Sequence, residues 1–390
     1  MFVTSKPDTK AQRLSHAHEE IVKATLPAVG EKIELIAHTF YGKMFTAHPE
    51  LLRDTFNRGN QKSGEQQKAL AASVATFATM LVDPNAPDPV DLLNRIAHKH
   101  VSLGITEDQY QIVHDNLLAA VAEVLGDAVT PEVAEAWSAV YWIMADILIA
   151  HEKVLYASDN VEPGDVFRDA KVIEKHVLTD RVTEYVLEGD FTEPQPGQYT
   201  SIGVKLDDGA RQLRQYSIIG GDATQYRIAV ETDGEVSNHL RAKVEVGDTI
   251  QATLAAGELV LQDSDRPAVL ISSGIGSTPM VGMLAHLAQN KTSREVLYLH
   301  ADDSAESWAQ EGHIRALAGQ LDNCQLVSAV RSNGELLDVS AHNLGGADVY
   351  ICGGTNFLQA IRSNIDSLEP AAQPASVKFE LFSPNDWLIN

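Results

Sequence analysis

The spacing of apolar residues changes twice along the chain. From about Ser15 to Tyr156 apolar residues recur every three or four positions without competing strand-like alternation, which predicts α-helices. Proline and glycine divide this part into six expected helices that form one bundle. Expected helices end at His48-Pro49 and at Asp83-Pro84. A short helix is expected over 90–101, and the last two helices are expected to begin at Thr106 and Thr130.

After a polar linker at 158–164, the pattern becomes short β-branched or aromatic segments separated by glycine, aspartate and proline turns. Such segments predict a small antiparallel barrel or sandwich. The expected strands are 169–179, 182–188, 198–204, 212–219, 225–231 and 249–254, and one helix is expected over 235–243.

From Pro267 onward, expected strands alternate with expected helices, and this order predicts a doubly wound parallel sheet with helices on both faces. The strands are 268–272, 295–300, 324–330, 348–352 and 377–382, and the helices are 280–289, 305–320 and 357–367. We therefore expect a multidomain α and α/β protein. An all-α domain spans 13–157, an antiparallel β-barrel domain spans 165–263, and a doubly wound parallel α/β domain spans 266–390.

Composition narrows the classes of partner. Lys and Arg number 30 against 54 Asp and Glu, a net charge of −24, which argues against binding to nucleic acid or to an anionic membrane. Two cysteines, Cys324 and Cys352, exclude a disulfide framework and a Cys-rich metal site. The N-terminus lacks the apolar core of a signal peptide, and Asp146 interrupts the longest apolar run. We expect a cytoplasmic monomer without a stable membrane anchor.

One histidine has the position of a metal ligand. His100 continues the apolar positions Leu93, Ile96 and Ala97, so its imidazole is expected to point inward. One imidazole cannot complete a tetrahedral zinc site, but it suffices as an axial ligand of haem iron, because the porphyrin supplies the other nitrogens. The alternative is an ordinary core histidine, which the spacing alone favours.

Two polar residues on the preceding helices favour the haem ligand over the core histidine. Gln66 lies one turn before Leu70 on an apolar face, and Tyr41 lies beside Phe40. Burying a glutamine and a tyrosine is costly unless both find hydrogen-bond partners. A ligand between these helices would supply them.

Several short motifs now point to a known family. They are Phe40-Tyr41-Gly42-Lys43-Met44-Phe45, Pro49-Glu50-Leu51 leading to Phe56-Asn57, Asn60-Gln61 followed by Gly64-Glu65-Gln66, and Ala97-His98-Lys99-His100. As a set they resemble the globin domain of the flavohaemoglobins. The motifs described below match the same family in order, so the resemblance covers nearly the whole chain after about a dozen N-terminal residues.

The resemblance implies a haem b site. It makes His100 the proximal iron ligand, packs Phe56 on the porphyrin, and places Tyr41, Gln66 and Leu70 in the distal pocket. A phenol donor such as Tyr41 would stabilise negative charge on a bound ligand in a dry pocket.

The resemblance also implies a proximal hydrogen-bond network in which Tyr110 and Glu152 bond to the imidazole. A carboxylate at the imidazole N–H makes the iron ligand more electron-rich. A core phenol and a surface carboxylate are the alternatives. Lys99 resembles a family lysine that faces the flavin side, and a solvated lysine is the rival interpretation.

The expected barrel contains the run Arg214-Gln215-Tyr216-Ser217. Strand alternation puts Arg214 and Tyr216 on one face, where a guanidinium can pair with pyrophosphate and a ring can cover isoalloxazine. The run resembles the Arg-x-Tyr-Ser signature of ferredoxin-reductase-like proteins. By that resemblance, Ser217 forms a hydrogen bond near the reactive flavin nitrogen, and Tyr199 contributes to the same flavin site from a neighbouring strand.

A second feature that fits FAD lies at the start of the helix expected in the barrel. Val236 and Ser237 lie in its first turn, where a helix N-terminus can bind pyrophosphate, although the same pattern is an ordinary N-cap. The choice of FAD rather than FMN rests on the family.

The last expected domain has a glycine-containing loop directly after a strand. Glycines let the backbone approach phosphate, and the helix dipole favours its charge. The loop resembles the Gly-x-Gly-x-x-Pro loop of reductases that bind NAD(P)H beside a flavin. Its residues are Gly274, Ile275, Gly276, Ser277, Thr278 and Pro279.

Two further family motifs depart from the usual sequence. Cys352-Gly353-Gly354 stands where the family has Cys-Gly-Pro, and Glu380-Leu381-Phe382-Ser383-Pro384 stands where it has Glu-Cys-Phe-Gly-Pro. By the resemblance, Phe382 covers the flavin until nicotinamide displaces it, and Glu380 influences the flavin potential. A core aromatic is the alternative for Phe382.

The family implies a nitric oxide dioxygenase: NAD(P)H reduces FAD, FAD reduces the haem, and nitric oxide and dioxygen become nitrate. One alternative is an oxygen carrier or sensor whose reductase keeps the iron ferrous. The other is a general NADH-dependent reductase of hydroperoxides, quinones or ferric compounds. Tyr110 and Glu152 favour the enzyme, because a carrier gains nothing from a strongly donating imidazole.

Overall fold

The computed structural model describes residues 13–83 and 89–382, apart from the side chains of residues 63, 65–69, 71, 72 and 89–92. The chain divides into two compact units. Of the described residues, those up to Phe167 form the first unit together with Lys205–Leu213. The second unit holds Arg168–Val204 and the residues from Arg214 onward.

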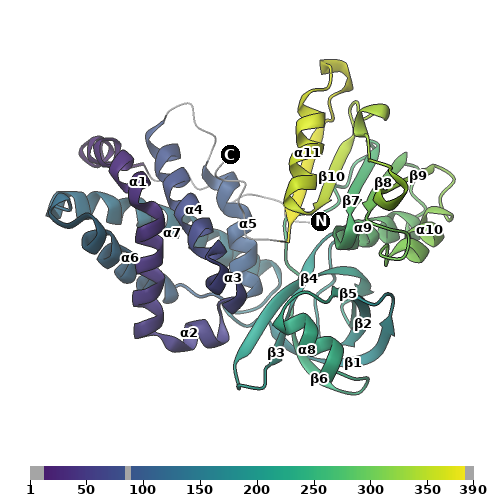
Figure 1. Ribbon diagram of the computed structural model, residues 1–390, viewed down its shortest axis with the longest axis horizontal. Helices are drawn as coiled ribbons and strands as arrows, with labels where there is room; N and C mark the ends of the chain where they lie inside the picture. The colour runs from purple at the N-terminus through teal and green to yellow at the C-terminus, as the bar shows by residue number, and fades with distance from the viewer. Residues whose placement is uncertain (1–12, 84–88, 383–390) are drawn as a thin grey trace. The chain divides into compact units, whose positions relative to one another are not determined.

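The first unit is helical (Figure 1). Ser15 and Thr130 accept N–H groups of the first turns of the first and last helices, as N-caps do. Buried aliphatic and aromatic side chains of α1, α4, α5, α6 and α7 form one core. The helices are α1 (His16–Ala47), α2 (Pro49–Asp54), α3 (Arg58–Ser63), α4 (Glu65–Val82), α5 (Pro89–Ser102), α6 (Gln109–Leu125) and α7 (Pro131–Ser158).

The prediction of six helices was wrong, because seven α-helices lie in the described part of this unit. α2 and α3 are six residues each and are too short to show helical periodicity. The helix expected to open at Thr106 begins at Gln109. Gln109 accepts the Thr106 N–H at 3.0 Å, while the Thr106 hydroxyl bonds to Asp108. α7 is long and apolar enough to cross a membrane by composition alone, but half of its apolar window is buried in the core.

The strands from β1 to β6 form a closed antiparallel barrel, as predicted, with strand order β1-β2-β5-β4-β3-β6. Most of its residues belong to the second unit, but Phe167 and Lys205–Leu213 are grouped with the first. Closure leaves the sheet without an open edge. Helix α8 (Glu235–Lys243) spans the predicted residues. The strands are β1 (Phe167–Val177), β2 (Val182–Glu188), β3 (Tyr199–Lys205), β4 (Arg211–Asp222), β5 (Gln225–Glu231) and β6 (Thr249–Thr253).

The rest of the second unit is a five-stranded sheet of order β11-β10-β7-β8-β9, in which all paired strands are parallel. Its central strand β7 is buried along nearly its whole length, as expected for a sheet covered on both faces. The elements are β7 (Ala268–Ser273), α9 (Ser277–Gln289), β8 (Val296–Asp302), α10 (Glu311–Ala318), β9 (Cys324–Val330), β10 (Asp348–Gly353), α11 (Thr355–Asp366) and β11 (Ser376–Leu381).

One predicted helix is too long. The apolar pattern suggested 305–320, but α10 begins at Glu311. Ser304 and Ser307 accept each other's backbone N–H groups, and the Ser307 hydroxyl also bonds to Asp302. These side-chain bonds stabilise a turn in place of the first helical turns.

Candidate functional site

Three helices of the first unit bring His100, Tyr110 and Glu152 together. His100 lies on α5, and its Nδ1 is 2.8 Å from Glu152 Oε1 on α7 and 3.0 Å from the Tyr110 hydroxyl on α6. Tyr110 donates its hydroxyl to the same Glu152 oxygen at 2.5 Å. The three residues lie up to 52 positions apart in sequence, so only helix packing joins them.

Burial and the neighbouring carboxylate determine the role of Tyr110 in this cluster. Glu152 is 3% exposed, and Tyr110 is buried beside it. Burial raises the pKa of Tyr110 strongly, and the negative charge of Glu152 raises it further, so the phenol remains a donor. With the carboxylate as acceptor, Nδ1 of His100 carries the proton and Nε2 has a free lone pair.

The free lone pair makes His100 a candidate metal ligand. Among the described residues, its nitrogen bonds all involve Nδ1. No group of three or more His, Cys, Asp or Glu side chains in this part of the chain could hold a metal ion. A lone, oriented imidazole therefore fits an axial haem ligand better than it fits a multi-residue ion site.

An aromatic cluster surrounds Tyr41 on α1. Tyr41 is 5% exposed, and its ring lies 4.7 Å from Phe40, 5.5 Å from Phe45 and 5.9 Å from Phe56, measured between ring centroids. Phe56 comes from the turn between α2 and α3 and meets Tyr41 edge-on at 80°. Leu70 packs partly buried against the same core. Tyr41 and Phe56 are thus neighbours.

Two further residues of the predicted site are Gln66 and Lys99. The side chain of Gln66 lies outside the described residues, so its position in the pocket stays a prediction. Lys99 is exposed at the end of α5.

On the barrel, the predicted flavin motif lies on β4. Arg214 is mostly covered, and its guanidinium is 3.5 Å from the Glu235 carboxylate at the start of α8. Burial raises the pKa of the Tyr216 hydroxyl, while the charge of Arg214 opposes that shift. Ser217 is buried, and Gln215 donates to the Ser201 hydroxyl at 3.1 Å.

Neighbouring elements complete this region. Tyr199 forms a bridge with Ala256, and a Cβ on Gly257 would lie 3.0 Å from its ring. Val236 and Ser237 are buried in the first turn of α8. The Ser237 hydroxyl accepts the N–H groups of Asp233 and Gly234, so its observed role is to cap the helix.

The glycine loop follows β7 and leads into α9. Gly274 has a φ of +52°, a conformation that glycine adopts without cost. A Cβ on Gly276 would stand 2.6 Å from the carbonyl oxygen of Cys352, at the end of β10. Gly353 has no room for a Cβ either, since it would collide with the Ser273 hydroxyl. The two loops touch through backbone, and the α9 N-terminus beside them can bind a phosphate.

The remaining loop residues occupy the start of α9 and of α11. Ser277, Thr278 and Pro279 are buried in the first turn of α9, and Ile275 lies in the short 3₁₀ turn before it. Gly354 is the N-cap of α11, and a Cβ there would meet no atom within 4 Å.

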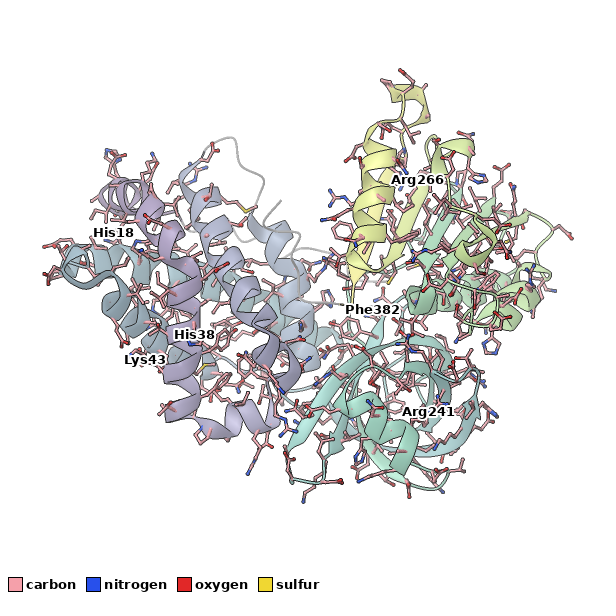
Figure 2. The ribbon with its side chains drawn as sticks, viewed as in Figure 1. His18, His38, Lys43, Arg241, Arg266 and Phe382 are labelled. Carbon is pink, nitrogen blue, oxygen red and sulfur yellow. The ribbon has the colours of Figure 1, made fainter. Side chains whose placement is uncertain are left out.

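The end of β11 lies beside these loops. Glu380 pairs with Cys352 and Leu381 pairs with Gly353 in parallel register. Phe382 follows at the carboxyl end of the strand and is 50% exposed (Figure 2). It is therefore not a core aromatic. Ser383 and Pro384 lie outside the described residues.

Sequence reasoning missed two buried groups. His300 on β8 is fully buried, bonds to the Ser272 hydroxyl at 2.9 Å and to Asp302 at 3.2 Å, and stacks on Trp308. Gln212, two residues before Arg214, is 1% exposed and bonds to the turn that carries Phe56. A polar residue inside a predicted strand was the available signal for each, but only packing shows what it contacts.

Comparisons with known proteins agree with this arrangement. The globin family model matches residues 38–148. The chain is 40% identical to a flavohemoprotein of Deinococcus radiodurans, covering 95% of this chain and 98% of that one. It is 33% identical to a flavohemoprotein of Bacillus subtilis, with 94% and 96% covered.

Two solved structures are also similar. One is a flavohemoglobin from Malassezia yamatoensis with bound FAD and heme, at 32% identity and a TM-score of 0.88, covering 95% of this chain and 100% of that one. The other is the FAD/NAD binding domain of nitric oxide dioxygenase from Vibrio cholerae, at 29% identity and a TM-score of 0.50. That match covers 55% of this chain and 98% of the other.

Proposed function

This chain belongs to the flavohaemoglobin family, and from that premise we propose that it is an NAD(P)H-dependent nitric oxide dioxygenase. The overall reaction converts two nitric oxide and two dioxygen molecules into two nitrate ions, with one NADH or NADPH supplying the two electrons and a proton being released. The proposed organisation is a globin domain over 13–157, an FAD barrel over 165–263 and a nicotinamide domain over 266–390. We also propose a cytoplasmic monomer whose partners are small molecules.

When bound, haem, FAD and nicotinamide supply the redox chemistry that protein side chains lack. On the proximal side, Glu152 accepts the Nδ1–H of His100 and orients the ring, so that Nε2 would hold the iron. Tyr110 donates to the same Glu152 oxygen in a buried place. This network carries the proposal, because a strongly donating imidazole suits oxygen activation more than reversible storage.

On the distal side, the chain's own residues would form a dry pocket. Phe56 and Leu70 would present apolar surface, while the Tyr41 hydroxyl and the Gln66 amide would donate hydrogen bonds to a bound ligand. The close packing of Tyr41 with Phe45 and Phe56 supports this assignment, since it limits the positions that the phenol can adopt.

The second unit would bind the two nucleotides. On the barrel, Arg214 would pair with the FAD pyrophosphate, Tyr216 and Tyr199 would contact the ring system, and Ser217 would bond near its reactive nitrogen. Gln215, Val236 and Ser237 would line the same site.

The carboxyl edge of the parallel sheet would bind the nicotinamide nucleotide. Loop 274–279 would hold its pyrophosphate and residues 352–354 would place its ring. Glu380, Leu381 and Phe382, with Ser383 and Pro384, would lie against the flavin, and Lys99 would face the flavin from the globin domain. The exposure of Phe382 supports this assignment, because an aromatic ring at a strand end can be displaced by an incoming ring.

A single mixing experiment tests the function. The protein is loaded with haem and FAD, reduced anaerobically with NADH, and mixed with dioxygen and nitric oxide. Stoichiometric nitrate with matching NADH consumption supports the dioxygenase. An unchanged dioxygen complex would instead support a carrier, and NADH oxidation with quinone or ferric acceptors but no nitrate would support a general reductase.

A further inference from the structure

Gln212 is a buried polar residue that the proposed function leaves unused. It belongs to the first compact unit, with the helices, and is 1% exposed. Its amide nitrogen donates to the carbonyl oxygens of Arg53 at 3.0 Å, Phe56 at 3.1 Å and Leu52 at 3.4 Å. Its amide oxygen accepts the Arg58 N–H at 3.3 Å. Both ends of one side chain thus bond to a single stretch of backbone, residues 52–58.

This stretch needs such partners. α2 ends at Asp54 and α3 begins at Arg58, and both helices have only six residues. The last carbonyl groups of a helix and the first N–H groups of the next have no partners inside those helices. Helices this short are also unstable without outside contacts. Gln212 bonds to orphan groups on both sides of the turn and therefore holds the two helix ends together.

Other side-chain contacts to residues 52–58 are more exposed than those of Gln212. The Asp208 carboxylate bonds to the Arg58 guanidinium at 2.6 Å, but 57% of the Asp208 side chain is exposed. The Arg211 N–H bonds to Asp54 at 3.2 Å. Exposed ion pairs contribute little to stability, whereas buried bonds to backbone are costly to lose. Gln212 is therefore a buried fixing point of the turn.

The turn carries Phe56, whose ring meets both Tyr41 and Phe45 edge-on. The centroid distances are 5.9 Å to Tyr41 and 5.3 Å to Phe45. The Phe56 carbonyl is itself a Gln212 acceptor, so the bond acts on the residue that supports the phenol. A shift of the turn would loosen the packing that limits the Tyr41 ring.

We propose that Gln212 is a positioning residue of the haem pocket, which holds Phe56, and through Phe56 the Tyr41 phenol, in place over a bound ligand. This inference rests on the proposed function, in which Tyr41 and Phe56 line that pocket. Gln212 touches neither substrate nor cofactor, and it acts by fixing backbone.

The test compares Gln212→Glu and Gln212→Met with Asp208→Asn in the full-length protein. Glutamate keeps the size of the side chain but replaces the N–H donors with oxygens that repel the three carbonyls. Methionine removes the donors without adding charge, so it serves if Gln212→Glu fails to fold. Asp208→Asn removes only the exposed ion pair on the same segment and is the matched control.

Two readouts separate positioning from general stability. Hydrogen exchange of the peptide covering 52–58, measured by mass spectrometry without any added ligand, should become at least about tenfold faster in both Gln212 variants. Dioxygen dissociation from the reduced, haem-loaded protein should become roughly threefold to tenfold faster, while NADH reduces FAD at the original rate. Asp208→Asn should change neither by more than about twofold.

Unchanged exchange at 52–58 would overturn the proposal, because Gln212 would not be holding the turn. Faster exchange with an unchanged dioxygen dissociation rate would also overturn it and leave Gln212 a purely structural role. A wild-type protein that binds haem but makes no nitrate would remove the dioxygenase function without affecting this result. The two failures are therefore distinguishable.

Discussion

Two of the candidate cofactor regions, the haem region around His100 and the nicotinamide region at the sheet edge, differ in which groups form them. Around His100 the site consists of side chains, joined by hydrogen bonds that cross three helices and end on one buried carboxylate. At the carboxyl edge of the parallel sheet it consists mainly of backbone, where Gly276 and Gly353 allow two loops to touch.

The difference shows which substitutions each region tolerates. In the helical region the chemistry depends on a few named atoms, so replacing one residue removes it while the fold persists. At the sheet edge the chemistry depends on space, so adding one methyl group displaces the loop that would bind phosphate. Removing a side chain should therefore abolish function in the helical region, whereas adding a side chain should abolish it at the sheet edge. Each mutation should leave the other region working.

The largest expected effect is at His100. His100→Ala removes the only side chain that we assign to the iron, so the haem Soret band should be lost. NADH should still reduce the flavin, because that step uses the other unit. Absorption spectra before and after NADH addition measure both, and retention of a normal Soret band would contradict the ligand assignment.

The reciprocal change is Gly276→Val. A Cβ there would stand 2.6 Å from the Cys352 carbonyl oxygen, so the loop must move. A displacement of about 1 Å can cost about 100-fold in rate, and we expect a loss of that order in flavin reduction by NADH, with the Soret band unchanged. Stopped-flow flavin bleaching measures the rate.

A control for Gly276→Val is Gly312→Ala on α10, where a Cβ would meet no atom within 4 Å. It should leave flavin reduction as in the wild type. If Gly276→Val also reduced flavin at the wild-type rate, the loop would not be the nucleotide site.

A smaller effect is expected at Glu152. Glu152→Gln keeps the size of the side chain but removes the charge that accepts the Nδ1–H of His100, so the imidazole becomes a weaker donor to the iron. The iron reduction potential should rise, and nitrate production should fall by about tenfold to 100-fold. Spectroelectrochemistry measures the potential.

Glu107→Gln is the control for Glu152→Gln, because the Glu107 side chain is 62% exposed and pairs with the exposed Lys153. Equal potentials for the two variants would show that Glu152 has no influence on the iron.

The smallest effect concerns pH and the buried His300. Burial lowers the pKa of His300 below its usual value of 6.5, although Asp302 opposes the shift. In the unfolded chain the imidazole binds a proton below about pH 6.5, so its contribution to stability is present above that pH and is lost as pH falls below it. The second unit should therefore melt at lower temperature at pH 5.5 than at pH 7.5.

His300→Gln should reduce that difference in melting temperature. The measurement is the midpoint of thermal flavin release at the two pH values. An identical pH difference in wild type and variant would exclude His300 as a source.

Sequence patterns predicted the elements well where burial repeats regularly. The predicted strands 182–188, 225–231 and 324–330 and the helix 235–243 match the observed bounds. The pattern failed where side chains compete with backbone, as in the serine turn before α10, and where helices are as short as α2 and α3. Local spacing carries no information about bonds to distant segments.

The sequence by itself determined the order of all-helical, barrel and doubly wound parts, and it marked His100, Arg214 and the glycine loop as candidates. These follow from periodicity and from residue types whose chemistry is local. The family resemblance implied that Tyr110 and Glu152 bond to His100, but only the tertiary structure shows that Nδ1 is the nitrogen involved. Only the tertiary structure shows that Gln212 bonds to the turn carrying Phe56. The reason is that a hydrogen bond acts over about 3 Å, and which distant residues come that close depends on how complete helices and strands pack.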